Sequence, residues 1–246
     1  MSQTADPIAK QSYEDWHSRY EVDAESSTPW HRLVKAHLSG SADLAEKRVL
    51  EIGCGRGGFA CWLASQRPSP MKIVAADFSS TAVQKGRQFA SQRALSQIQW
   101  EVMDIEAIAH ADESFDTIIS CETIEHVPKP QKAVQELGRV LKPGGRLLLT
   151  TPNYMGIMGL YRMYLYLCGR PFSEEGQPIN NLMLLPRTRS MIAGAGLKIK
   201  VIDGIGHYLP FPGRPPIEVP VLNNPRPLMR WIAFHSLTIG EKPVKP

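Results

Sequence analysis

Two carboxylates and an imidazole stand close together in one short segment of the chain. Glu122, Glu125 and His126 lie at positions i, i+3 and i+4 of the string C-E-T-I-E-H-V-P. If a helix begins at residue 122, these side chains share one of its faces. Such a mixed set of oxygen and nitrogen ligands could bind Mg, Mn or Zn. The same groups could instead line a pocket, act as a general base or serve the structure alone, and the spacing leaves these roles open.

A glycine-rich loop forms a second candidate site. The string E-I-G-C-G-R-G-G begins at Glu51 and follows an apolar run. Gly53, Gly55 and Gly58 allow a tight turn and a close approach of the backbone to a ligand. They also satisfy the pattern G-x-G-x-x-G, so a nicotinamide dinucleotide site has to be considered. By itself the loop could equally be a tight turn between a strand and a helix.

Two further carboxylates stand at the ends of later apolar runs. Asp77 ends one run, where a carboxylate can accept both ribose hydroxyls of an adenosine group. Asp104 ends the next run and could meet an adenine amino group. Glu51 precedes the glycines at a place where a dinucleotide fold usually has an apolar residue. Together these features favour an adenosyl ligand over a nicotinamide dinucleotide.

The elements that must position these residues alternate between strand and helix. Apolar runs predict strands, and the segments between them helices; K-P-G-G predicts a turn. The predicted strands are 48–54, 71–78, 98–104, 114–122 and 146–153, the helices 58–66, 80–94 and 131–141, and the turn 142–145. This alternation indicates an α/β fold, a Rossmann-like doubly wound and mostly parallel sheet covered on both faces. Such sheets bind ligands beyond the carboxyl ends of their strands, which is where the candidate residues fall.

The two ends of the chain differ from this core. Residues 1–12 are predicted to be frayed, and residues 13–38 predict one or two helices with a start before Pro29. Twelve of the 20 prolines lie at or beyond Pro171, which excludes continuous helix there. In this region we expect a helix at 184–196, a strand at 197–204 and a short helix at 228–237. One structural domain would thus comprise a helical cover (1–47), a ligand-binding core (48–153) and a cap with the last strands and a C-terminal helix (154–246).

Composition narrows the class of protein. The 246 residues include 28 Lys and Arg against 24 Asp and Glu, and the net charge of +4 gives no indication of a nucleic-acid partner. The four cysteines form no C-x-x-C pair, so a disulfide framework is not expected. The N-terminus lacks a signal-peptide core, and the chain has no apolar run long enough for a transmembrane helix. We therefore expect an intracellular, cytoplasmic protein.

Five motifs, taken in order, resemble those of the class I S-adenosylmethionine-dependent methyltransferases. They are VLEIGCGRGG, VAADFS, VMDIE, FDTIISCETIEHV and LKPGGRLLLTTPN, which span roughly residues 48–153, about two-fifths of the chain. The resemblance implies S-adenosylmethionine as cofactor, with the glycines along its methionine part, Asp77 on the ribose and Phe78 beside the adenine. The implied cofactor-binding residues are Glu51, Gly53, Cys54, Gly55, Asp77, Phe78, Asp104, Ile105 and Cys121.

Within that class, the string E-x-x-E-H-V resembles two groups. These are the ubiquinone-biosynthesis O-methyltransferases and the small-RNA 2′-O-methyltransferases, some of which bind a metal there. The first group is the nearer, because its C-terminal pattern G-L-H-Y-N-P is similar to G-I-G-H-Y-L-P at residues 204–210. By this resemblance His207 becomes a fourth metal ligand or a second base. Asn180 and Asn181 depart from the polar, His-bearing segment that those relatives tend to carry.

Two segments are expected to enclose the acceptor. Residues 153–172 carry four tyrosines and three methionines; they predict a cap helix packed on the sheet, or a lipophilic lid or interfacial helix in peripheral contact with a membrane. Residues 13–38 should cover the cofactor, with candidate contacts from Trp16, Tyr20, Trp30, His31 and Arg32. The histidines without a motif are predicted to be surface or packing residues: His17, His37, His110 and His235.

The predicted function is therefore that of an S-adenosylmethionine-dependent methyltransferase acting on an oxygen of a small or lipophilic hydroxylated aromatic acceptor. Glu125 and His126 are the predicted catalytic residues. If a divalent metal assists, its predicted ligands are Glu122, Glu125, His126 and His207. C- or N-methylation stays open, because the cofactor motifs do not encode the nucleophile. The further alternatives are an RNA 2′-O-methyltransferase, a nicotinamide oxidoreductase and a cofactor-binding module without catalysis.

Overall fold

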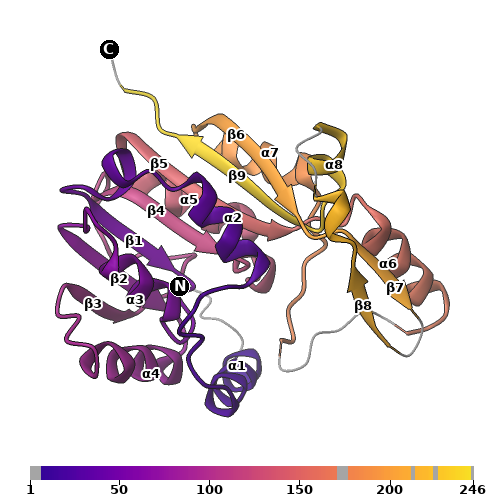
Figure 1. The fold of residues 1–246 in the computed structure, drawn as a ribbon, viewed down its shortest axis with the longest axis horizontal. Helices are drawn as coiled ribbons and strands as arrows, with labels where there is room; N and C mark the ends of the chain where they lie inside the picture. Colours follow the sequence, from indigo (N-terminus) through magenta and orange to yellow (C-terminus); the bar gives the residue numbers. More distant parts are fainter. Residues whose placement is uncertain (1–6, 171–176, 212–213, 224–226, 245–246) are drawn as a thin grey trace.

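The computed structural model describes residues 7–170, 177–211, 214–223 and 227–244. Within these ranges a seven-stranded sheet lies among helices, and a two-stranded sheet stands apart from it (Figure 1). The strands are β1 (Arg48–Ile52), β2 (Lys72–Asp77), β3 (Ile98–Val102), β4 (Phe115–Cys121), β5 (Leu141–Pro152), β6 (Lys198–Ile205), β7 (Tyr208–Phe211), β8 (Arg214–Glu218) and β9 (His235–Glu241). The α-helices are α1 (Pro7–Arg19), α2 (Pro29–His37), α3 (Gly58–Ser65), α4 (Ser80–Ser91), α5 (Pro130–Val140), α6 (Ile157–Leu167), α7 (Leu185–Gly194) and α8 (Pro227–Ile232). Shorter helical turns are η1 (Gly40–Leu44), η2 (Ile124–His126) and η3 (Pro220–Leu222).

The strand order of the large sheet is β3-β2-β1-β4-β5-β9-β6. The first five strands of the sequence are parallel, whereas β9 runs antiparallel to both β5 and β6. The chain moves outward from β1 to β3 and then returns to place β4 on the other side of β1. Sheets of this kind bind ligands at the carboxyl ends of their strands, beside this reversal. The predicted α/β fold with a doubly wound, mostly parallel sheet is confirmed.

Alternating side chains of the parallel strands pack into two hydrophobic cores, one on each face of the sheet. In β1, Leu50 and Ile52 join the core that includes residues of α5 and α7. Val49 joins the core on the other face, with residues of α2, α3 and α4. Because successive strand residues point to opposite faces, a strand covered on both sides must be apolar throughout. The exception in β1 is Glu51, a buried carboxylate near the carboxyl end of the strand.

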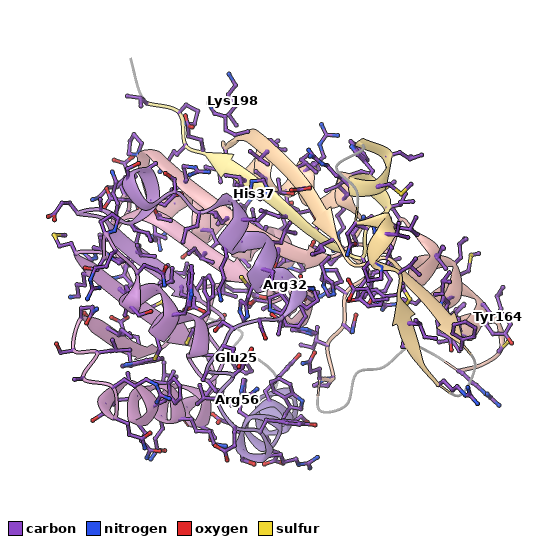
Figure 2. The ribbon with its side chains drawn as sticks, viewed as in Figure 1. Glu25, Arg32, His37, Arg56, Tyr164 and Lys198 are labelled. Carbon is purple, nitrogen blue, oxygen red and sulfur yellow. The ribbon has the colours of Figure 1, made fainter. Side chains whose placement is uncertain are left out.

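The segments outside the β1–β5 core lie at two places on the molecule. α6, the β7–β8 hairpin and α8 form a cap that projects beyond the large sheet on the right of Figure 1. Tyr164 of α6 lies at the outer edge of this cap in Figure 2. At the N-terminus, α1 packs against α4, and α2 packs against β9, β6 and β5.

Three predictions about elements are wrong. The chain is helical from Pro7, although residues 1–12 were expected to fray, because α1 is held by distant residues described below. K-P-G-G is part of β5, since Gly144 and Gly145 exchange backbone hydrogen bonds with Lys242 beyond β9. The helix predicted at 228–237 ends at Ile232 and is followed by β9, whose residues are buried on both sides and so show no strand alternation.

Candidate functional site

A cavity of about 1020 Å³ opens at the carboxyl ends of the first four strands. Its walls combine the loops after these strands with residues from α1, α2 and the start of β9. A pocket for one small molecule usually measures about 300–1,000 Å³, so this cavity has room for a cofactor and a second molecule. Glu51, Gly53 and Asp77 all line it, which places the glycine loop and the predicted ribose carboxylate in one cleft.

The glycine loop turns at this edge because its residues adopt backbone angles that side chains rarely allow. Gly53, Gly55 and Gly57 have φ angles of 75°, 51° and 76°. A Cβ atom at Gly53 would also overlap the side chain of Thr123, so this position needs glycine for space as well as for conformation. The N–H groups of Gly53 and Cys54 both donate to the carbonyl of Ala76, at 2.8 and 3.0 Å, and tie the loop to the end of β2.

Asp77 is fixed by backbone donors on both sides. Its Oδ2 accepts from the N–H of Gly55 at 2.9 Å, and its Oδ1 accepts from the N–H of Ser79 at 3.0 Å. The side chain is buried at the cavity wall. Each carboxylate oxygen has a second lone pair, so this anchored group can still accept from two neighbouring hydroxyls of a ligand.

An apolar slot lies between the ends of β2 and β3. Phe78 packs edge-on against Tyr13 with ring centroids 5.0 Å apart, and Ile105 is buried. Oδ1 of Asp104 accepts from the N–H of Glu106 at 2.8 Å. Phe78, Asp104 and Ile105 all line the cavity. A slot with apolar walls and a carboxylate at its end suits a flat heterocycle that carries an amino group.

Glu51 is a buried carboxyl group in the cavity wall, and its surroundings favour a positively charged ligand. Burial raises the pKa of this carboxyl well above its usual value, and the nearby charge of Asp77 raises it further. Its buried Oε2 has no hydrogen-bond partner among the described residues. A ligand ammonium would supply both a donor and a compensating charge. The glycine loop, Glu51, Asp77 and the apolar slot therefore fit a ligand with an adenosine group and an ammonium group.

Helix α1 is pinned over this edge by Glu14. Its carboxylate accepts from the hydroxyl of Ser79 at 2.7 Å and from the N–H groups of Ser80 and Thr81 at 2.8 and 2.9 Å. These donors belong to the first turn of α4, which favours a negative charge. Partial burial raises the pKa of Glu14, but the hydrogen bonds from Thr81, Ser79 and Ser80 outweigh it and lower the pKa to about 2.

Three of the five residues predicted to contact ligand from the N-terminal cover line the cavity. These are Trp16, Trp30 and His31. His31 stacks on Phe59, and burial lowers its pKa to about 4. Tyr20 and Arg32 are not among the lining residues, and Tyr20 packs instead against Trp16.

The prediction that a helix places Glu122, Glu125 and His126 on one face is wrong. Only the short turn η2 forms there, and Glu122 has a φ angle of 45°. Val127 is extended, as expected for a residue before proline, so no helix can continue. The side chains consequently separate into two pairs: Oε2 of Glu122 lies 3.2 Å from Nδ1 of His235, and Oε1 of Glu125 lies 3.6 Å from Nε2 of His126.

His207 does not join these residues. It borders a separate apolar cavity of about 100 Å³, where its Nδ1 and Nε2 lie 3.1 Å from Oδ1 of Asn223 and 3.0 Å from the carbonyl of Met229. Over the described ranges, no three His, Cys, Asp or Glu side chains are grouped so that they could hold a metal ion. The four predicted ligands therefore do not fit a metal ion in this structure.

The two cysteines of the predicted site, Cys54 and Cys121, both line the cavity. Burial raises the pKa of both thiols, and neighbouring carboxylates raise it further. Both cysteines are therefore neutral at physiological pH and serve as lining residues rather than as nucleophiles.

Sequence reasoning missed several residues of the cavity wall, among them Tyr13, His17 and His235. The hydroxyl of Tyr13 is 3.4 Å from the carbonyls of both His126 and Ile179. The spacing of Tyr13, Trp16 and His17 along one helix could have indicated an inward face. No local pattern marks His235, which reaches the cavity only because β9 lies next to β5.

Comparison with known proteins is consistent with this geometry. The family model described as "Methyltransferase domain" matches residues 50–149. The ubiquinone/menaquinone biosynthesis C-methyltransferase UbiE of Geotalea daltonii is 35% identical over 121 residues, which cover 48% of this chain and 52% of that protein. The ubiquinone biosynthesis O-methyltransferase of Neisseria meningitidis serogroup A is 32% identical over 118 residues, 48% of this chain and 49% of that protein. The chain thus spans about half the length of the curated relatives it matches.

A solved structure resembles the whole chain more closely in fold than in sequence. It is a chain of the complex between the Haloferax volcanii Trm112 methyltransferase activator and a methyltransferase. The TM-score is 0.67 at 17% identity, and the match covers 97% of this chain and 99% of that one. An identity this low shows the shared fold and no more.

Proposed function

The chain carries a methyltransferase domain of the class I S-adenosylmethionine-dependent type, and we propose that it methylates an oxygen of a small or lipophilic hydroxylated aromatic molecule. The observation that carries this proposal is the meeting of Gly53, Asp77 and Glu51 in one cavity that has room for a second molecule. The two halves of the proposal, cofactor and acceptor, rest on different parts of that cavity.

The cofactor half is supported by the donor set around the glycine loop. Asp77 would hold the ribose hydroxyls, and the apolar slot at Phe78 and Ile105 would take the adenine, with Asp104 on its amino group. The ammonium of the methionine part would meet the buried, unpartnered oxygen of Glu51. When bound, S-adenosylmethionine supplies a methyl group on a positively charged sulfur, which a nucleophile displaces in line.

The chain's own contribution to this chemistry is alignment and control of a proton. Holding an acceptor oxygen in line with the methyl carbon can contribute on the order of 7–11 kcal/mol to lowering the barrier. A phenol with a pKa near roughly 10 must also lose its proton at neutral pH, and a positioned base adds about 10²–10⁴-fold. The cavity offers imidazoles and carboxylates for that task at the ends of β4 and β9.

The acceptor half is supported by the walls beyond the cofactor residues. Trp30 and Phe234 give this part aromatic surface, and Glu125 and His126 give it polar groups. Glu125 and His126 stay our proposed functional pair of the β4 loop, as a base or as pocket walls. Oxygen as the methylated atom agrees with the name of the Neisseria relative, an O-methyltransferase, whereas the Geotalea relative is named a C-methyltransferase. C-methylation is therefore the second candidate.

Peripheral contact with a membrane, within a cytoplasmic location, is the third part of the proposal. On α6 the side chains of Leu160, Tyr166 and Leu167 are 64%, 73% and 76% exposed. Apolar and tyrosine side chains on an outer helix suit the interface of a lipid bilayer. In the described part of the chain, the helices are too short or too polar to span a membrane.

Calorimetry and a transfer assay test the proposal. We expect titration with S-adenosylmethionine to show binding and titration with NADH to show none. A labelled methyl group should then pass to a catechol, and NMR of the product should place it on oxygen. Binding of NADH without S-adenosylmethionine would contradict the proposal, and a labelled ring carbon would favour the C-methyltransferase alternative.

A further inference from the structure

A pair of a buried imidazole and a partly exposed carboxylate stands at the wall of the large cavity. His235 begins β9, opposite Pro152 at the end of β5 in the sheet register. Its Nδ1 lies 3.2 Å from Oε2 of Glu122, which follows β4. The pair joins residues 113 positions apart in the chain, and both side chains line the cavity.

The surroundings of His235 fix its ring and leave one nitrogen open. The rings of Phe234, Trp30 and Tyr208 surround it at centroid distances of 4.8, 5.2 and 6.0 Å. A carboxylate only accepts, so the hydrogen between the two groups belongs on Nδ1 of His235, and in the neutral imidazole this makes Nε2 the acceptor. Among the described residues, Nε2 of His235 has no hydrogen-bond partner and is not enclosed.

Glu122 has a backbone conformation that side chains rarely adopt. Its φ angle of 45° is in the left-handed region, which a glutamate rarely adopts. The N–H of Glu122 donates to the side chain of Thr150 at 3.1 Å. Its Oε1 is buried and has no partner among the described residues, although its Oε2 faces His235. The backbone thus aims a carboxylate into the cavity wall at His235.

The pair lies on the side of the cavity opposite the adenosine residues. Asp77 and Asp104 follow β2 and β3, whereas Glu122 follows β4 and His235 adjoins β5. The strand order puts β2 and β3 on one side of β1 and β4, β5 and β9 on the other. A cofactor whose adenosine lies at Asp77 and Asp104 would therefore present its other side to Glu122 and His235.

We infer that His235 is the base that takes the proton from the acceptor hydroxyl, with Glu122 as its positioning residue; this inference rests on the proposed function. The hydroxyl proton passes to Nε2 of His235 as the oxygen–methyl bond forms. The sulfur–methyl bond breaks, and its electron pair stays on the sulfur as a neutral thioether. The positive charge thus moves from the sulfonium to the imidazolium, which the carboxylate of Glu122 stabilises.

The other imidazoles of the cavity are less suited to this step. Nδ1 of His126 is 2.9 Å from the carbonyl of Ile179, and its Nε2 faces Oε1 of Glu125 at 3.6 Å. Both ring nitrogens of His126 are therefore already directed at protein oxygens. His31 and His17 belong to the N-terminal cover: Nδ1 of His31 lies 2.8 Å from the hydroxyl of Thr28, and Nδ1 of His17 lies 3.4 Å from Nη1 of Arg56.

The first test reads the tautomer of His235 and needs no acceptor. NMR of the full chain with ¹⁵N-labelled histidine and bound S-adenosylhomocysteine should show hydrogen on Nδ1 and a bare Nε2 at neutral pH. His110 is an internal control of opposite sense, because its Nε2 lies 2.9 Å from Oε2 of Glu101. Hydrogen on Nε2 of His235, or a bare Nδ1, would overturn the inference.

The second test compares acceptors of different acidity. The substitution His235→Asn keeps a donor for Glu122 but removes the base. It should therefore slow methylation of catechol by about 10²–10⁴-fold. The loss should shrink strongly for 4-nitrocatechol, whose hydroxyl is largely ionised without help. Glu122→Gln should slow the methylation of catechol more than that of 4-nitrocatechol. In this variant His235 should be present as a mixture of its two tautomers. His110→Asn, which alters a His–Glu pair outside the cavity, should keep the full rate.

Equal losses with both acceptors would mean that His235 has only a structural role and would overturn the inference. An acceptor-dependent loss in His126→Asn and none in His235→Asn would do the same. If S-adenosylmethionine binds but the unaltered protein methylates neither catechol, the proposed acceptor class fails. The tautomer of His235 then still decides whether a base stands ready at this wall.

Discussion

The two sides of the cavity are built in different ways. On the proposed cofactor side, Glu51 and Asp77 stand near the ends of two parallel strands and Asp104 follows a third, and backbone N–H groups hold the two aspartates in place. Asp77, for example, is fixed by Gly55 and Ser79 within the same strand–loop–helix units. On the acceptor side, contacts join distant segments, as in the pair of Glu122 and His235, 113 residues apart.

This difference has a functional consequence. The wall around the glycine loop is made of local turns, whereas the roof of the cavity comes from distant segments. In this chain the roof comes from the N-terminal helices, residues 177 and 179 and the start of β9. Substitutions on the two sides should therefore separate cofactor affinity from turnover.

The largest effect on cofactor affinity is expected from Asp77→Asn. A charged hydrogen bond contributes roughly 1.5–3 kcal/mol, so loss of the charge facing two ribose hydroxyls should weaken S-adenosylmethionine binding by about 10²-fold or more. Calorimetry measures this directly. Asp203→Asn is the matched control, because Asp203 pairs with His37 at 2.7 Å outside the cavity. An unchanged affinity in Asp77→Asn would refute the ribose assignment.

Gly53→Ala should affect both the fold and the site. An alanine at φ 75° costs roughly 1–2 kcal/mol, and its Cβ would overlap Thr123, so the loop must move. Gly169→Ala carries a similar φ of 69° with nothing within 4 Å of the added Cβ. Denaturant unfolding should show a larger loss of stability for Gly53→Ala, and only that variant should bind the cofactor at least tenfold more weakly. Equal losses of stability in the two variants would mean that the side chain of Thr123 moves aside for the added Cβ.

The attachment of α1 should depend on pH through Glu14. Its pKa in the folded protein, about 2, is below the ordinary value of 4.5. The stabilisation is therefore complete above about 4.5 and is lost as the pH falls through about 2. Hydrogen exchange of α1 amides, measured from pH 6 to pH 2, should rise toward acid beyond the intrinsic rate. The α1 amides of Glu14→Gln should exchange faster at every pH and show little of this extra rise toward acid. The same variant should bind the cofactor several-fold more weakly.

The control for Glu14 is Glu25→Gln, an exposed carboxylate in the segment between α1 and α2. It should exchange like the unaltered protein at every pH. If Glu14→Gln and Glu25→Gln behave alike, the contacts of Glu14 with α4 do not hold the cover in place.

The smallest effect on the cofactor is expected in the cap. Replacing both Tyr166 and Leu167 by serine should leave S-adenosylmethionine affinity unchanged. It should weaken co-sedimentation with vesicles of phosphatidylglycerol and phosphatidylcholine by about 30-fold, since each of the two exposed side chains contributes about 1 kcal/mol when it enters a membrane. Met71→Ser is the control, because Met71 is 60% exposed at the start of β2, outside the cap. Equal binding of all three proteins to vesicles would exclude α6 as the contact.

The sequence predicts the strands of the core and the glycine loop well because their determinants are local. Five apolar runs, the glycines and the carboxylates after each run specify β1 to β5 and the residues at their carboxyl ends, and the structure brings Gly53, Asp77 and Asp104 into one cavity. The same local reasoning fails at residues 122–126, where Pro128 prevents the predicted helix and η2 forms instead.

The acceptor side depends on pairings that no local pattern records. β9 lies between β5 and β6 and is buried on both faces. Its sequence therefore lacks the alternation of a half-exposed strand, and its first residues are compatible with the end of the predicted helix. His235 and Glu122 meet only through that pairing. Likewise, Glu14 reaches the first turn of α4 across 65 residues or more. His207, predicted from a motif, is instead held by Asn223 and Met229 beside the cap.

A crystal structure of the protein grown with S-adenosylhomocysteine would show directly where the cofactor binds. We expect the ribose hydroxyls to lie on Asp77 and the adenine between Phe78 and Ile105, while the thioether sulfur faces Glu122 and His235. Electron density for the ligand outside this cavity, or with its adenine beside His235, would refute both proposals.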